Sequence, residues 1–62
     1  YSHHGEEFIY IVEGKLDVYI DDVVHSLNEG DSLYFKSSQR HRFKNNTDKP
    51  TRAIWVVNPP TF

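Results

Sequence analysis

Three side chains in this sequence have the chemistry to hold a divalent metal ion: His3, Glu7 and His41. Imidazole nitrogens and a carboxylate oxygen are donors that Zn²⁺, Mn²⁺, Ni²⁺ and Fe²⁺ accept. Three protein donors also leave coordination positions open for water or a substrate. A polar pocket without metal is the alternative use of the same residues, and both uses need a fold that brings them together.

The periodicity of the neighbouring residues predicts that convergence. Side chains alternate between the two faces of a β-strand, so Glu7 shares a face with Ile9 and Ile11. His41 falls on the apolar face of its own strand, opposite the basic residues around it. If these apolar faces point into a barrel, Glu7 and His41 point inward with them. His3 reaches the same region from just before the first strand.

Apolar residues alternate at period two, and Gly, Asn, Asp and Pro interrupt them every few residues, which is typical of an antiparallel all-β barrel. The predicted strands span residues 7–12, 15–20, 23–27, 32–35, 41–44 and 51–57. The first two are joined by a turn at Glu13-Gly14 and are predicted to pair as a hairpin. The last is apolar on both faces from Ala53 onward, so we expect protein on each side of it.

Other polar and aromatic residues have simpler interpretations. His4 and Glu6 fall on the outward side of the first strand, and His25 is interpreted as a surface or packing residue rather than a ligand. Gly14 and Gly30 are expected to form turns. Because no basic groove accompanies them, the remaining aromatic residues are assigned to the core or to a dimer interface rather than to stacking on nucleic acid. These are Phe8, Tyr10, Tyr34, Phe35, Phe43 and Trp55.

Size and composition exclude several classes of protein. A chain of 62 residues forms one small domain, and domains of this size usually need additional stabilisation. The absence of cysteine excludes disulfides and cysteine-bound zinc. Seven Lys and Arg residues against nine Asp and Glu leave no basic patch, so we expect no nucleic-acid binding by this chain itself. No apolar run approaches the roughly 20 residues of a membrane span. We therefore expect a soluble, cytoplasmic protein.

The outward face of the first strand predicts self-association. Phe8, Tyr10 and Val12 lie opposite the inward set, and the last strand adds further apolar residues on both of its faces. One small barrel cannot cover all of them, and exposed apolar patches usually mark an interface. A two-fold homodimer is the commonest arrangement, and we expect it here.

Two stretches of the chain resemble the two motifs of the cupins. The first motif ends with His, three residues, Glu, six residues and Gly. The second runs Gly, five residues, Pro-x-Gly, two residues, His, three residues and Asn. The residues at matching positions here are His3, Glu7, Gly14, Gly30, His41 and Asn45. The resemblance implies a small antiparallel jelly roll, and it implies that His3, Glu7 and His41 hold a divalent metal inside it.

Three positions depart from these motifs. Tyr1 stands where cupins carry their first histidine ligand, so one of the four usual ligands is missing, and a neutral phenol is a poor replacement. Lys36 and Ser38 replace the Pro and Gly of the second motif, which is expected to change the loop that turns tightly before His41.

Within the cupins, the stretches GEEFIYIVEGKLDVYI and RAIWVVNPPTF are similar to the C-terminal sensor domain of bacterial helix-turn-helix transcription regulators. This implies a single cupin domain over residues 1–62 that senses a small-molecule effector or a metal. The first cupin strands and the DNA-binding domain would then be absent from this chain, and DNA would be bound only through that absent domain.

Two other interpretations remain open. One is a stand-alone, metal-dependent cupin enzyme of the dioxygenase or isomerase type, and the missing first histidine counts against it. The other is a β-barrel without any site. The sensor is preferred over both.

Overall fold

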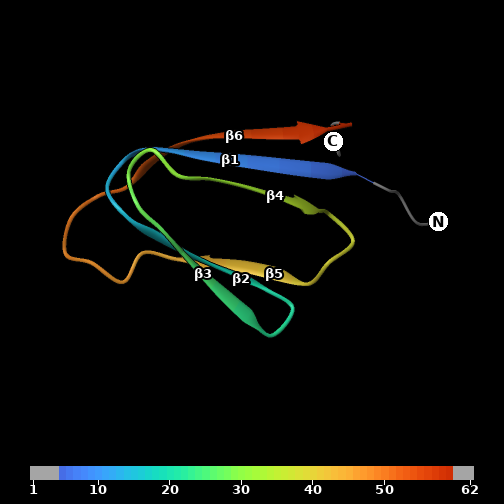
Figure 1. Cartoon of the computed structure of the whole chain (residues 1–62), viewed down its shortest axis with the longest axis horizontal. Helices are drawn as coiled ribbons and strands as arrows, with labels where there is room; N and C mark the ends of the chain where they lie inside the picture. The colour runs from blue at the N-terminus through green and yellow to red at the C-terminus, as the bar shows by residue number, and fades with distance from the viewer. Residues whose placement is uncertain (1–4, 60–62) are drawn as a thin grey trace.

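A computed structural model describes residues 5–59, which form two antiparallel sheets packed face to face (Figure 1). The strands are β1 (Glu6–Glu13), β2 (Leu16–Ile20), β3 (Val23–Leu27), β4 (Ser32–Lys36), β5 (His41–Lys44) and β6 (Arg52–Asn58). One sheet has the order β4-β1-β6 and the other has the order β3-β2-β5. The predicted all-β, antiparallel architecture is confirmed. Residues 5–59 include no helix with the length and apolar character needed to cross a membrane.

Alternating side chains from both sheets make the core. Strand β1 buries every second residue from Glu7 to Ile11, and Ile9 and Ile11 are completely buried. The buried apolar residues are Ile9, Ile11, Val18, Ile20, Leu27 and Phe35. The prediction that Glu7 points inward with Ile9 and Ile11 is therefore confirmed, and Phe8 and Tyr10 lie on the opposite, exposed face.

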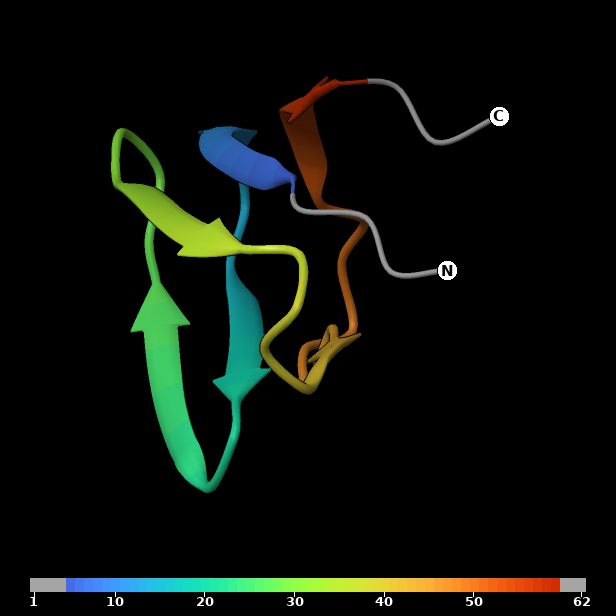
Figure 2. The same ribbon diagram turned by 90° about the vertical axis from the view of Figure 1, so that its right-hand side faces the viewer.

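The connections between strands differ from the sequence prediction. Strand β1 pairs with β4 and β6, whereas β2 pairs with β3 and β5, so the predicted hairpin between the first two strands is wrong. The Glu13-Gly14 turn instead carries the chain from one sheet to the other. The hairpin is formed by β2 and β3 (Figure 2). A turn signal reverses the chain, but the burial of apolar faces decides which strand becomes the partner.

Within residues 5–59, protein does not cover both faces of the last strand. In β6, Val57 is half-buried and the other residues are exposed. Strand β6 lies at the edge of the β4-β1-β6 sheet, and no further layer within residues 5–59 covers the outer side of that sheet, so any cover there must come from elsewhere, such as the predicted second copy.

Both turn glycines have a left-handed backbone, but only one is in a crowded place. The φ angles are 90° at Gly14 and 89° at Gly30. A Cβ atom added at Gly14 would lie 2.9 Å from the carbonyl oxygen of Pro50 and 3.0 Å from Oγ1 of Thr51, whereas one added at Gly30 would meet nothing within 4 Å.

This difference predicts unequal effects of the same substitution. Gly30→Ala should lower the free energy of unfolding by about 1–2 kcal/mol, which is the cost of a left-handed alanine. Gly14→Ala should cost clearly more, because the new methyl group also meets the backbone of the segment that leads into β6. Urea denaturation of the two variants measures both values, and equal losses would contradict the close packing at Gly14.

The outer face of the β4-β1-β6 sheet, defined by its outward-pointing side chains, is largely apolar. Its two central cross-strand rows are Tyr34–Phe8–Val56 and Ser32–Tyr10–Ile54, and neither contains a charge. Their apolar members are between 39% and 54% exposed. The sheet carries charges of both signs towards each end, with Glu6 beside Lys36 at one end and Glu13 beside Arg52 at the other. When two copies meet through this face about a two-fold axis, each end of the sheet therefore offers the partner charges of both signs.

The predicted homodimer can be tested on this face. Tyr10→Glu should shift the protein towards monomer in analytical ultracentrifugation, because it places a charge in the centre of the contact. Val24→Glu is the matched control, since Val24 is 51% exposed but belongs to the other sheet. A wild-type protein that sediments as a well-folded monomer at micromolar concentration would rule out the dimer.

Candidate functional site

Glu7 and His41 meet between the two sheets. Glu7 lies on β1, and His41 is the first residue of β5 in the opposite sheet. Oε2 of Glu7 lies 3.7 Å from Nε2 of His41, and the two side chains are 11% and 27% exposed. The structure thus brings together two of the three predicted metal ligands. The third, His3, and Tyr1 at the position of the missing ligand lie outside the described residues.

A hydrogen bond on the far side of the imidazole ring fixes the form of His41. Nδ1 lies 2.7 Å from the carbonyl oxygen of Gln39. A carbonyl oxygen only accepts, so Nδ1 carries the hydrogen and donates it. In the neutral ring, Nε2 then keeps its lone pair on the side of Glu7. A histidine that ligates a metal usually donates its other ring hydrogen in this way.

The carboxylate of Glu7 is also held in place. The indole Nε1–H of Trp55 donates a hydrogen bond of 2.9 Å to Oε1 of Glu7. One carboxylate oxygen is therefore engaged by β6, while the other faces His41.

Aromatic rings surround this polar pair. The ring of Phe35 lies 5.0 Å from that of His41, and the ring of Phe43 lies 5.7 Å from it, centroid to centroid. Trp55 and Phe43 meet edge to face at 4.1 Å. Phe35 is almost fully buried. These rings keep water from part of the site, and the lower local dielectric strengthens the interactions of Glu7.

The loop before His41 is a tight turn, although it lacks the Pro and Gly of the cupin motif. The Gln39 amide N–H donates to the Lys36 carbonyl at 2.9 Å. The side chain of Gln39 strengthens this turn, because its Oε1 accepts from the Lys36 N–H at 3.0 Å. Its Nε2 donates to Asp21 at 3.3 Å. The hydrogen bonds of Gln39 thus close the turn that the Pro and Gly of the motif are expected to form.

The donor atoms fit a divalent metal ion. Two donors 3.7 Å apart can both lie at about 2.0–2.2 Å from one ion, the usual range for nitrogen and oxygen ligands of zinc. When the imidazole is neutral, the lone pairs of His41 Nε2 and Glu7 Oε2 face each other and repel. A proton on the ring, or a cation between the two atoms, makes the contact favourable. No third His, Cys, Asp or Glu joins them among residues 5–59. His3 as the third donor stays a prediction.

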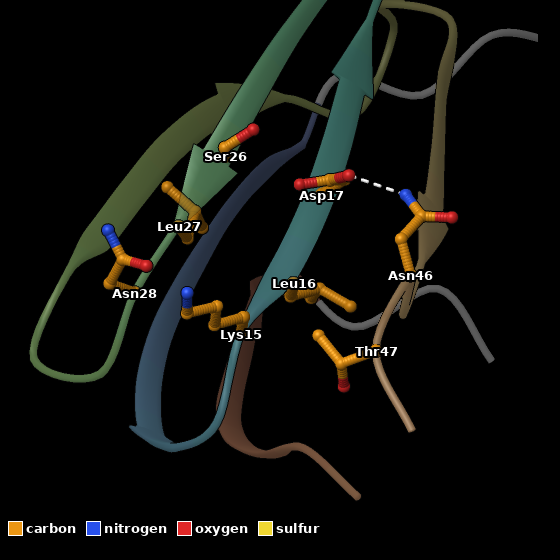
Figure 3. Close-up of a pocket in the computed structure, with 8 residues that line it drawn as sticks. All are labelled: Lys15, Leu16, Asp17, Ser26, Leu27, Asn28, Asn46 and Thr47. Carbon is orange, nitrogen blue, oxygen red and sulfur yellow. Dashed lines mark hydrogen bonds between the residues drawn. The ribbon is translucent and has the colours of Figure 1, made fainter. Parts of the chain in front are cut away.

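A hollow of about 290 Å³ at the other end of β2 is a weaker candidate (Figure 3). Lys15, Leu16 and Asp17 approach it from β2 and the turn before it, and Asn46 lies across from Asp17. The Asp17 carboxylate already accepts a hydrogen bond from Asn46. The remaining lining residues are Ser26, Leu27, Asn28 and Thr47. No buried or mutually facing ionisable groups distinguish this hollow, so we place the site at Glu7 and His41.

Sequence reasoning missed two residues of the site. The sequence pattern assigns Trp55 to the core or an interface and gives Gln39 no role in the site. A partly buried indole N–H needs a hydrogen-bond acceptor, and this requirement is the signal that could have linked Trp55 to a buried carboxylate. The signal for Gln39 was its place in the altered loop, directly before Arg40 and His41. Among the other candidates, His25 is half-buried on β3, which agrees with a packing role, and Glu6 is exposed.

Comparison with known proteins places the chain among relatives of one family. The profile of the family described as "Cupin domain" matches residues 1–57. Over 59 residues the chain is 37% identical to Protein SchB of Streptomyces halstedii, 36% identical to Polyketide synthase CurC of Streptomyces cyaneus and 27% identical to Tetracenomycin polyketide synthase protein TcmJ of Streptomyces glaucescens.

Each of these matches covers 95% of this chain but only 43%, 38% and 40%, respectively, of the relative. The chain therefore spans less than half the length of the curated relatives that it matches. No solved structure matches it significantly.

The bond between His41 and Gln39 predicts which tautomer His41 adopts. Nitrogen-15 NMR of the neutral ring should show the hydrogen on Nδ1, because the neighbouring carbonyl can only accept it. Gln39→Ala should weaken this preference, since it removes the two side-chain bonds that hold the turn. His25 serves as an internal reference whose tautomer should not change. A neutral His41 with its hydrogen on Nε2 in the wild-type protein would disprove the arrangement.

Proposed function

Because the chain belongs to the cupin domain family, we propose that it forms the core of a small metal-dependent cupin enzyme that acts in polyketide synthesis. The observation that carries the proposal is the pair of donor atoms, one from each sheet, that face each other at 3.7 Å inside the sandwich. The substrate class we propose is a polyketide chain with its repeated carbonyl groups, which offer oxygen atoms to a metal.

The relatives support the enzyme better than the regulator sensor predicted from the sequence. Two of the three carry polyketide synthase in their names, and none is named as a regulator. The similarity of two sequence stretches to a regulator sensor domain concerns the type of cupin, and the relatives do not support that type. The cupin assignment stands, and the enzyme that was the alternative becomes the preferred function.

The residues have separate roles in this proposal. His41 would hold the ion through Nε2, which carries no hydrogen in the neutral ring because Nδ1 donates to Gln39. Glu7 would hold it through Oε2, and His3 is proposed as the third protein donor. A bound divalent ion supplies Lewis-acid polarisation of a substrate carbonyl. Phe35 and Phe43 limit the access of water beside the pair.

Calorimetric titration with Zn²⁺, Mn²⁺, Ni²⁺ and Fe²⁺ tests the metal site. The wild-type protein should bind at least one of them, and His41→Ala and Glu7→Gln should each weaken binding about tenfold or more, because too few donors remain to compete with water. The matched controls are His25→Ala and Glu6→Gln, which change the same residue types outside the pair. Equal affinities in all five proteins would disprove the site.

Product analysis of the full-length protein separates the enzyme from the sensor. The metal-loaded wild type should change the products that a synthetic poly-β-ketone forms, as judged by mass spectrometry, whereas Glu7→Gln should give only the products that form without protein. Metal binding without any conversion would favour a sensor instead.

A further inference from the structure

The two oxygens of the Glu7 carboxylate are used differently. Oε1 accepts the indole N–H of Trp55 at 2.9 Å, and Oε2 is the oxygen that lies nearest Nε2 of His41. The carboxyl group of a glutamate rotates freely about its last torsion unless something holds it. The bond from Trp55 removes this freedom at Glu7.

The indole ring is itself fixed by contacts with both sheets. In the β1–β6 pairing Trp55 stands opposite Ile9, so its side chain is on the inner face of the sheet, one diagonal step from Glu7. Phe43 of the other sheet meets the ring edge to face. Trp55 is 39% exposed, so it is placed by these specific contacts and not by complete burial.

We propose that Trp55 is a positioning residue, whose indole N–H holds Oε1 of Glu7 so that Oε2 alone is presented to the ligand shared with His41. The part of this inference that concerns the ligand rests on the proposed metal function, whereas the orientation of Glu7 does not. The consequence is that Glu7 would bind an ion through one oxygen only.

Ordering the carboxylate before binding should increase affinity. A ligand residue that must first be immobilised loses conformational freedom when the ion arrives, and this loss weakens binding. Partners that orient metal ligands are typically worth 10–100-fold in affinity. The N–H group of Trp55, as distinct from its size, should account for such a factor here.

An isosteric replacement separates the N–H group from the bulk of the ring. The chain contains a single tryptophan, which can be replaced by benzothienylalanine, whose ring has sulfur in place of the N–H. This replacement and Trp55→Phe should each lower the affinity for Mn²⁺ or Zn²⁺ about tenfold in calorimetry. The matched control is Tyr34→Phe, which deletes the corresponding bond from Tyr34 to Glu6 on the outer face and should leave the affinity unchanged. Undiminished affinity after the isosteric replacement would overturn the role.

A second measurement needs no metal. In the metal-free protein, the indole N–H resonance of Trp55 in a proton–nitrogen spectrum should move to higher field in Glu7→Gln, because the hydrogen bond loses its charged acceptor. In Glu6→Gln it should stay in place. An unmoved resonance in Glu7→Gln would disprove the contact. If the wild type binds no metal but the resonance moves as expected, the proposed function fails while the orientation of Glu7 by Trp55 stands.

Discussion

A carboxylate buried between two sheets has to find its partners inside the protein, and at Glu7 this requirement connects both halves of the fold. The alternation that buries Ile9 and Ile11 on β1 also turns Glu7 inward. An ionised carboxylate without partners would cost several kcal/mol in that position. Trp55 on the neighbouring strand donates a hydrogen bond to Glu7, and His41 of the opposite sheet lies 3.7 Å from it, close enough for one cation to sit between them. The contacts of this one buried carboxylate therefore define the candidate site.

Local pattern in the sequence predicts the faces of strands well and their partners poorly. Period-two alternation correctly placed Glu7 with Ile9, and it predicted that His41 would face the interior. It could not predict that β1 and β2 belong to different sheets, because a turn signal at Gly14 is the same for a hairpin and for a crossing between sheets. The bond from Trp55 to Glu7 joins residues 48 positions apart, and no local pattern encodes such a contact. His3 remains the part of the predicted site that the described residues leave untested.

The loop before His41 forms a tight turn although it lacks the Pro and Gly of the cupin motif. Pro and Gly favour a tight turn through the backbone angles that they adopt easily. Lys36 and Ser38 lack that preference, and the turn is instead closed by the backbone of Gln39 and strengthened by its side chain. The carbonyl of the same residue fixes the imidazole. A residue outside the family pattern thus supports the ligand that the pattern identifies.

The crossing of the chain between sheets has a consequence for the order of folding. Only the β2–β3 pair is local in sequence, while β1 must wait for β4 and β6 to be brought back to it. Contacts between distant segments stabilise the chain only after the entropy of closing the intervening loops has been lost, so such topologies fold slowly. Glu7, His41 and Trp55 come from three segments that meet only when the sheets dock. If the proposed ion binds Glu7 and His41 together, it would stabilise contacts that form late in folding, so it would slow unfolding and have little effect on the folding rate.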